Sequence, residues 1–254
     1  MIDNGQVACG LPPAPFIGTA GWNIPSEYAN FFSRVGTHLE RYATRLNAVE
    51  INSSFYRPHR RATYERWAQS VPAHFRFAVK VPREMTHTLR LMPCADHLDS
   101  FAAQIDGLGA KLGVVLAQLP PSLAFEASSA SGFFEGLRAR VDGRSALACE
   151  PRHESWFSAA ADLCLANLKV ARVAADPPRA VEDGKPGGWH DLAYYRLHGA
   201  PRTYYSNYDA DALARTRRSL DENCARGIST WCIFDNTAAF AALGNALAIG
   251  VVNP

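Results

Sequence analysis

Several charged side chains follow short apolar runs in the sequence, where strand ends could bring them together for acid/base chemistry. Glu50 and Glu150 could form a carboxyl pair, one of which would act as acid or base if burial or a like charge raised its pKa. We expect Glu150 to be the acid/base, with His198 or Glu50 as its partner. Lys80 joins them as a cation that would stabilise developing negative charge. These four residues are the catalytic candidates.

A second group of residues near the same strand ends could bind a substrate. The arginines and histidines among them could together clamp an anionic or oxyanionic group. Taken singly, such residues often serve as a structural ion pair, as loop packing or as a loop cap. Charges of both signs that converge from different strands are costly without a ligand to bind, so we interpret the set as a functional site. The binding candidates are Trp22, Asn52, Tyr56, Arg57, His87, Gln118, Arg152, His153, Trp156, Asp176, Arg196, Asp235 and Asn236.

Eight apolar runs that end in these polar side chains predict eight β-strands. Between the runs the apolar spacing changes from every second residue to every third or fourth, which indicates helices packed against a sheet. Alternating strands and helices in a chain of 254 residues predict a single (β/α)8 TIM-type barrel, whose chemistry lies at the C-terminal strand ends. The runs lie at 16–17, 48–49, 77–79, 114–116, 146–148, 170, 192–194 and 231–234.

The alternation of side chains within each strand predicts which residues share the barrel interior. Val49 and Ile51 should face the helices, which leaves Glu50 and Asn52 on the opposite face. The same argument applies to the third, fifth and seventh strands. It places the following residues in or just above the barrel mouth, where they should pair with one another or with a ligand: Glu50, Lys80, Glu150, Arg196 and His198.

The chain has no composition break that would mark a second domain. We expect an N-terminal tail at residues 1–15 and one barrel domain at residues 16–254. The segment 176–191 is rich in proline and glycine. A loop of this length at a strand's C-terminal end is more often a binding element or lid than a linker, and a disordered insertion is the alternative.

Composition argues against some classes of partner. The formal charge of +2 and pI near 8.2 do not make nucleic acid the default partner. The six cysteines show no C-x-x-C or zinc-type spacing and are expected to be reduced. With no signal-like segment and no membrane-length apolar stretch, we expect a cytoplasmic protein with a small, anionic substrate and no membrane association. The oligomeric state does not follow from the sequence.

A divalent metal is an alternative to purely organic acid/base chemistry. The distribution of possible ligands looks like that of xylose isomerase and endonuclease IV barrels, and comprises Glu50, Glu150, Asp176, His198 and Asp235. The nearby Lys80, Arg152 and Arg196 would compete for the same carboxylates, so we assign no metal ligands. No dinucleotide fingerprint or P-loop pattern occurs, and no cofactor is predicted.

Six motifs in order resemble the YecE-like family, called domain of unknown function 72. The resemblance implies a TIM-type barrel from about Phe16 to Leu247 but supplies no substrate, because the family's biochemical activity is not established. The motifs are at 18–22, 49–57, 75–80 with 86–87, 112–113 with 118–121, 150–156, and 194–199.

Two departures from the family pattern lie near the last strand. Members usually carry Phe-x-Asn-Asn there, whereas this chain has Asp235 before Asn236, and the acid alters the local charge. The segment 238–246 also lacks the glycine and small-Pro pair that often begin the following helix. Both departures weaken any transfer of ligand contacts from the eighth strand.

Three functions therefore fit the sequence. The first is an enzyme acting on a small anionic carbon-oxygen substrate by general acid/base chemistry. The second is a metal-dependent hydrolase or nuclease-like phosphodiesterase, a less favoured alternative in which a basic surface contacts nucleic acid; that surface would comprise Arg57, Arg60, Arg61, Arg66 and Arg83. The third is a non-catalytic barrel that holds a metabolite.

Overall fold

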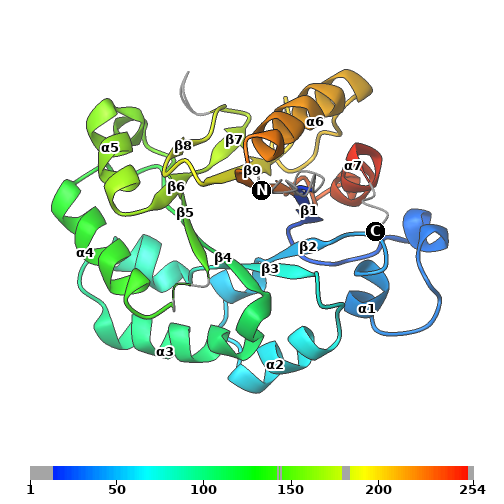
Figure 1. Ribbon diagram of the computed structural model, residues 1–254, viewed down its shortest axis with the longest axis horizontal. Coiled ribbons are helices and arrows are strands. Elements are labelled where there is room, and N and C mark those ends of the chain that lie inside the picture. Colours follow the sequence, from blue (N-terminus) through cyan, green and yellow to red (C-terminus); the bar gives the residue numbers. More distant parts are fainter. Residues whose placement is uncertain (1–13, 142, 144, 179–183, 251–254) are drawn as a thin grey trace, which may run out of the picture.

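A computed structural model describes residues 14–141, 143, 145–178 and 184–250. Most of the expected N-terminal tail, residues 1–13, lies outside the described residues, as does 179–183 within the proline- and glycine-rich segment. Strands alternate with helices along the chain, and the helices lie around the outside of the strands (Figure 1). The protein therefore has the expected α/β character.

The strands form two mainly parallel sheets. One has the order β1-β10-β9-β7 and the other β2-β3-β4-β5-β6-β8, with β8 antiparallel to β6. The expected sixth strand is split into β6 and β7 by Val173, and β8 lies in the segment predicted as a loop. The strands are β1 (Phe16–Thr19), β2 (Ala48–Ile51), β3 (Arg76–Lys80), β4 (Leu112–Gln118), β5 (Ala146–Glu150), β6 (Val170–Arg172), β7 (Ala174–Asp176), β8 (Gly187–Gly188), β9 (Leu192–Leu197) and β10 (Ser229–Phe234).

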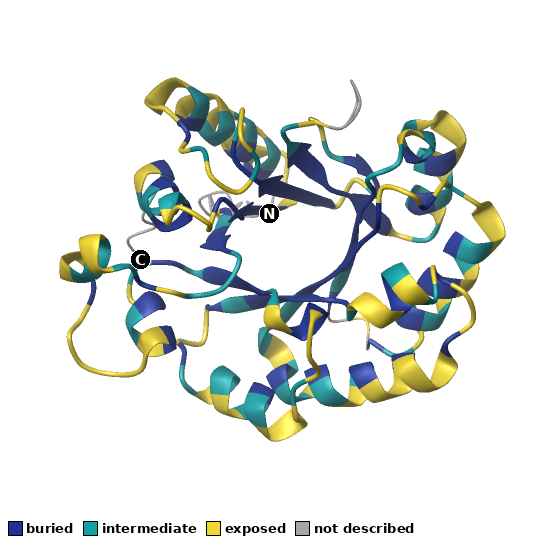
Figure 2. Ribbon diagram, turned by 180° about the vertical axis from the view of Figure 1, so that it is seen from behind, coloured by how far each residue is buried: buried dark blue, intermediate teal, exposed yellow. Residues whose placement is uncertain are grey.

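Four of the helices described on the outside, the first, fourth, fifth and sixth, begin at a residue whose side chain caps them. Thr37 and Glu40 form a capping box at the first helix, and Ser158 and Asp209 cap later ones. The outward faces are mostly exposed, whereas the strands are buried (Figure 2). The helices are α1 (His38–Tyr42), α2 (Arg61–Gln69), α3 (Ala95–Ile105), α4 (Ala127–Arg138), α5 (Ala159–Asn167), α6 (Ala210–Ala225) and α7 (Ala241–Ile249). Within the described residues no helix is long and apolar enough to cross a membrane.

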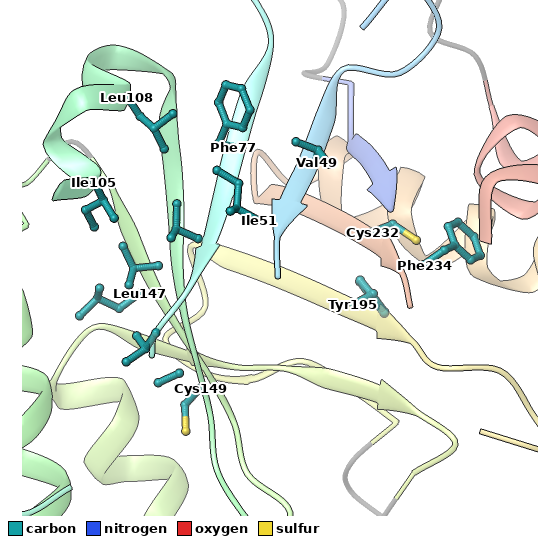
Figure 3. Packing of buried hydrophobic residues seen from close by; sticks show 14 of the residues in the cluster. Val49, Ile51, Phe77, Ile105, Leu108, Leu147, Cys149, Tyr195, Cys232 and Phe234 are labelled. Atoms are coloured by element: carbon teal, nitrogen blue, oxygen red, sulfur yellow. The ribbon is translucent and has the colours of Figure 1, made fainter. Parts of the chain in front are cut away.

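Two separate apolar clusters confirm the predicted alternation along the strands. Val49 and Ile51 belong to the larger cluster, between strands and helices (Figure 3). Ala48 belongs to a smaller cluster on the opposite face of the strands, where the rings of Tyr194 and Trp231 stack with centroids 5.9 Å apart. The next residues along this inner face, toward the C-terminal strand ends, are charged.

The two sheets approach each other closely at β1 and β2. An isolated parallel bridge joins Ala20 to Glu50, and Tyr42 donates its hydroxyl to the Ala48 carbonyl at 3.0 Å. A side chain at Gly18 would collide with that same Ala48 carbonyl. Glycine at position 18 is therefore needed for the two strands to lie this close.

We predict that Gly18→Ala lowers the free energy of unfolding by about 1–3 kcal/mol, because the added methyl group must displace backbone. The matched control is Gly132→Ala in α4, where an added Cβ meets nothing within 4 Å. That change should raise stability by up to about 1 kcal/mol, since alanine favours a helix over glycine. Urea unfolding measures both, and a Gly18→Ala protein as stable as the parent would contradict the close approach.

Candidate functional site

The guanidinium of Arg196 lies at the centre of a buried charge cluster. Its Nε and Nη2 donate to the two Glu50 carboxylate oxygens at 3.0 and 2.7 Å, and Nη2 also donates to Asp235 at 2.9 Å. Nη1 donates to Glu150. Burial alone would lower the pKa of Arg196, but the three carboxylates together hold it well above its usual value. Arg196 is therefore a permanent cation in contact with three acids.

His198 continues this cluster above Arg196. Its Nε2 lies 2.9 Å from Glu150 and its Nδ1 lies 3.1 Å from Asp235. A carboxylate oxygen can only accept, so the ring bonds to both acids when both nitrogens carry protons. Burial lowers the pKa of His198, but Glu150 and Asp235 outweigh it and raise the pKa above its usual value. Below this raised pKa, His198 is an imidazolium that bonds to both acids.

Glu150 is held ionised by its neighbours. Arg152 donates to it from Nε and Nη2 at 3.0 and 2.7 Å, and Gln118 donates at 3.1 Å. Burial alone would raise the pKa of Glu150, but Arg196, His198 and Arg152 hold it well below the usual range. A proton donor must first hold a proton, so this environment disfavours Glu150 as an acid near neutral pH. Its role as a base stays a prediction, and its carboxylate bonds to the cations around it.

Lys80 lies beside the buried charge cluster but takes part in none of the ion pairs described for its members. Three carboxylates, Glu50, Glu150 and Asp235, face three cations, Arg152, Arg196 and His198. Lys80 is thus the excess cation of a balanced cluster. It is only 4% exposed, and within the described residues its ammonium group makes no hydrogen bond or ion pair.

The surroundings of Lys80 lower its pKa on balance. Its Nζ lies 4.1 Å from the centroid of the Phe55 ring, and this cation–π contact favours the charged form. Burial and then Arg196 lower the pKa of Lys80, the three carboxylates raise it less, and the result is about 8. Lys80 can therefore gain and lose a proton near neutral pH, whereas neighbouring cations lower the pKa values of Glu150 and Asp235.

A cavity of about 450 Å³ lies at the C-terminal strand ends and includes Lys80 in its wall. This volume is in the range of small-molecule sites. Arg152, Gln118 and Asp235 connect its wall to the charge cluster. The other lining residues are Asn52, Phe55, Tyr56, His87, Leu119, Pro121, Tyr204, Tyr205, Thr237 and Ala238.

The structure divides the residues singled out from the sequence into three groups. Asn52, Tyr56, Lys80, His87, Gln118, Arg152 and Asp235 line the cavity. Glu50, Glu150, Arg196 and His198 form the cluster that Asp235 shares. The remaining candidates do not line the cavity and are Trp22, Arg57, His153, Trp156, Asp176 and Asn236.

Most of the candidates outside the cavity have a local structural explanation. Trp156 is buried and donates to the Leu123 carbonyl at 2.9 Å, and Trp22 packs edge-on against Trp67. His153 caps the turn that follows it.

Asp176 lines a different cavity, of about 210 Å³, and accepts from the Tyr208 hydroxyl at 2.6 Å. Asn236 donates to Ser206 and Asn245, while Arg57 is exposed.

Sequence reasoning found Tyr56 in the cavity wall but missed its other three aromatic residues. Phe55, Tyr204 and Tyr205 line it, and the Tyr204 ring packs edge-on against His198. Phe55 lies three residues after Asn52 in the motif at the end of the second strand, and this position could have predicted that it lines the site. The two tyrosines lie on the connection between β9 and α6, where no alternation indicates which residues turn inward.

The geometry does not fit a metal ion. The carboxylates of Glu50, Glu150 and Asp235 converge on Arg196, which takes the place that a cation would need. Asp176 is bonded to Tyr208 in another cavity. Among the described residues no three histidine, cysteine or acidic side chains are grouped as a metal site.

Known proteins similar to this chain agree with its fold. A family model described as "Protein of unknown function DUF72" matches residues 16–250. The protein YecE of Escherichia coli K12 is 28% identical over 145 residues, which is 56% of this chain and 50% of YecE. YunF of Bacillus subtilis is 27% identical over 149 residues, covering 56% and 52% respectively. The matched region thus spans about half the length of these curated relatives.

Two crystal structures of DUF72 family proteins are similar to the whole fold. One from Thermotoga maritima superposes with a TM-score of 0.76 at 23% identity, covering 93% of this chain and 98% of its own. One from Enterococcus faecalis has the same TM-score at 18% identity, with coverage of 91% and 92%. At these identities the similarity supports the fold alone.

We predict that Arg196→Met lowers the free energy of unfolding by about 3–5 kcal/mol, because it leaves three buried carboxylates without their shared partner. The control is Arg61→Met, which removes exposed ion pairs to Glu65 and Asp106 and should change stability little. Urea unfolding near neutral pH measures both. Equal effects of the two substitutions would contradict a central role for Arg196.

The pKa of Lys80 predicts a pH-dependent contribution to stability. The unfolded chain binds the Lys80 proton more tightly than the folded chain does. Burial of Lys80 therefore lowers the free energy of unfolding by its full amount below pH 8, and by progressively less as the pH rises toward 10.5. Lys80→Met should therefore be more stable relative to the parent at pH 7 than at pH 10, by about 2.5 kcal/mol. Urea unfolding of both proteins at the two pH values measures this difference, and a constant difference would contradict the lowered pKa.

Proposed function

The chain belongs to the DUF72 family, which is described as of unknown function, and on that premise we propose that it is an enzyme using general acid/base chemistry on a small anionic carbon-oxygen substrate. The observation that carries this proposal is the buried Lys80 amine in the wall of the 450 Å³ cavity. A group with a pKa of about 8 suits proton transfer near neutral pH.

The charge of the cavity wall supports an anionic substrate. Lys80 and Arg152 contribute positive charge, whereas the carboxylate of Asp235 is already bonded to Arg196 and His198. Burial, then Arg83, Lys80 and Arg152, lowers the pKa of His87, which leaves this wall residue neutral for hydrogen bonding. The excess charge offered to a ligand is therefore positive.

In this mechanism Lys80 is the acid/base and the acids support it. Glu50 and Glu150 hold Arg196 and Arg152 in place, so that Arg152 can bind the anionic group of the substrate. Developing negative charge on a substrate oxygen would be stabilised by these fixed cations without reorganisation. Glu150 and His198 thus support the site instead of exchanging protons with the substrate.

The proposal includes a single (β/α)8 barrel built from both sheets. The two sheets meet at two places, and both support the barrel. At one, Val173 is the single residue between β6 and β7; at the other, a parallel bridge joins Ala20 to Glu50. Taking β6 and β7 as one bent strand, eight strands then surround the inner cluster. The free thiols of the described cysteines fit a reducing compartment and support the cytoplasmic location included here.

A non-catalytic metabolite-binding barrel would use the same cavity, and the locked charge cluster favours it as the second candidate. A ligand recovered chemically unchanged after long incubation would favour this alternative. For the nuclease-like alternative, Arg61 of the basic surface is already paired with Glu65 and Asp106, and the donor set does not fit a metal.

The test is a screen of carboxylated and phosphorylated hydroxy and keto compounds for binding and turnover. We expect Lys80→Met to remove turnover by about 10²–10⁴-fold. If Lys80 acts as the base, kcat/KM should rise with pH up to about 8 and then level off, because the free amine accumulates. The exposed Lys169→Met is the matched control and should leave turnover unchanged. Full activity in a folded Lys80→Met protein would contradict the proposal.

A further inference from the structure

We infer that Lys80 is a covalent nucleophile that forms an imine with the aldehyde or ketone group of an anionic substrate. This inference rests on the proposed function and narrows its substrate class to carbonyl compounds that also carry a carboxylate or phosphate. The observation behind it is a buried primary amine, without an acceptor for its protons, in the wall of a cavity large enough for a small metabolite.

The immediate surroundings of Lys80 compensate its charge only weakly. An ammonium group has three protons to donate, yet within the described part of the chain Nζ has no hydrogen-bond acceptor. The Phe55 ring at 4.1 Å favours the cation, whereas burial and Arg196 lower the pKa of Lys80. Buried lysines whose charge is poorly compensated serve as Schiff-base nucleophiles because the amine form carries the reactive lone pair.

The balanced charge cluster explains why nearby acids do not keep Lys80 protonated. Glu50 and Glu150 direct their oxygens to Arg196 and Arg152, and Asp235 is shared by Arg196 and His198. These shorter contacts use the carboxylates, and Arg196 itself repels a second cation. With a pKa of about 8, about one Lys80 in ten is a free amine at pH 7, against fewer than one in a thousand for an ordinary lysine.

The position of Lys80 suits attack on a bound carbonyl. It is the last residue of β3, and its backbone carbonyl accepts from the Ser54 hydroxyl at 2.6 Å, so the base of the side chain is fixed. Arg152 lines the same cavity and offers a guanidinium for the anionic group. Among the described lining residues no serine or cysteine offers a competing nucleophile.

The step balances without an oxidant or reductant. The Nζ lone pair attacks the carbonyl carbon, the C–N bond forms, and the carbonyl oxygen takes a proton to give a carbinolamine. The C–O bond then breaks, the oxygen leaves as water with the second amine proton, and a C=N bond remains. Neutral His87 in the cavity wall can carry a proton between nitrogen and oxygen.

The experiment is reductive trapping of the full chain with sodium borohydride in the presence of pyruvate or glyoxylate. We expect one reduced adduct by intact mass, located at Lys80 by peptide mapping, with trapping that increases as the pH is raised from 6 to 8. Acetone, a neutral ketone, should be trapped at least ~10-fold less, because it lacks the group that Arg152 binds.

Matched variants separate covalent chemistry from charge. Lys80→Arg keeps a cation and should give no adduct, whereas Lys169→Met should give as much adduct as the parent. Arg152→Met should reduce trapping of pyruvate or glyoxylate ~10-fold or more, because it removes the guanidinium that binds the anionic group. Circular dichroism and urea unfolding confirm that each variant is folded.

Two outcomes would overturn the inference. The first is an adduct that forms equally on Lys80 and Lys169, since this would reflect ordinary lysine reactivity. The second is binding and turnover of anionic compounds by the parent without any trapped adduct, which removes the imine but leaves the acid/base proposal intact. Failure of the proposed function would look different from failure of the imine. The parent would then not turn over the anionic compounds, or a folded Lys80→Met protein would turn them over equally well.

Discussion

The buried guanidinium of Arg196 is the interaction on which the rest of the site depends. Glu50 comes from β2, Glu150 from β5, Asp235 follows β10, and all three contact this one side chain. An uncompensated charge in this position would be very costly. The cluster thus joins distant strands of the two sheets at the end where the cavity opens. It also pairs Glu50 and Glu150, which the sequence predicts as catalytic, with the buried Arg196.

The equal numbers of acids and cations in this cluster help to set the pKa of Lys80. Because Arg152, Arg196 and His198 already match the three acids, a fourth cation gains little from being charged and loses its hydration by burial. In the proposed function the residues therefore have two roles. The paired residues fix shape and electrostatic potential, and Lys80, with a pKa of about 8, is the group that reacts.

Much of the fold could be predicted from the sequence, because alternation and apolar spacing are local. Val49 and Ile51 pack toward the helices as expected, and Glu50 lies on the opposite face. Pairing in the barrel mouth could be predicted, but the individual partners could not, because they depend on distances between strands: Glu150 bonds to Arg196, which holds it ionised. Trp156 follows β5 and Asp176 ends β7, yet their partners Leu123 and Tyr208 are set by loop conformation.

The central claim is that Lys80 titrates near neutral pH beside a cluster that does not need its charge. An NMR titration of the protein with selectively labelled lysine side chains measures the pKa of Lys80 directly. The Lys80→Arg variant assigns the signal. The account predicts a midpoint at about 8 for Lys80 in the folded protein. A midpoint near the ordinary lysine value of about 10.4 would contradict it, because Lys80 would then be a paired cation like its neighbours.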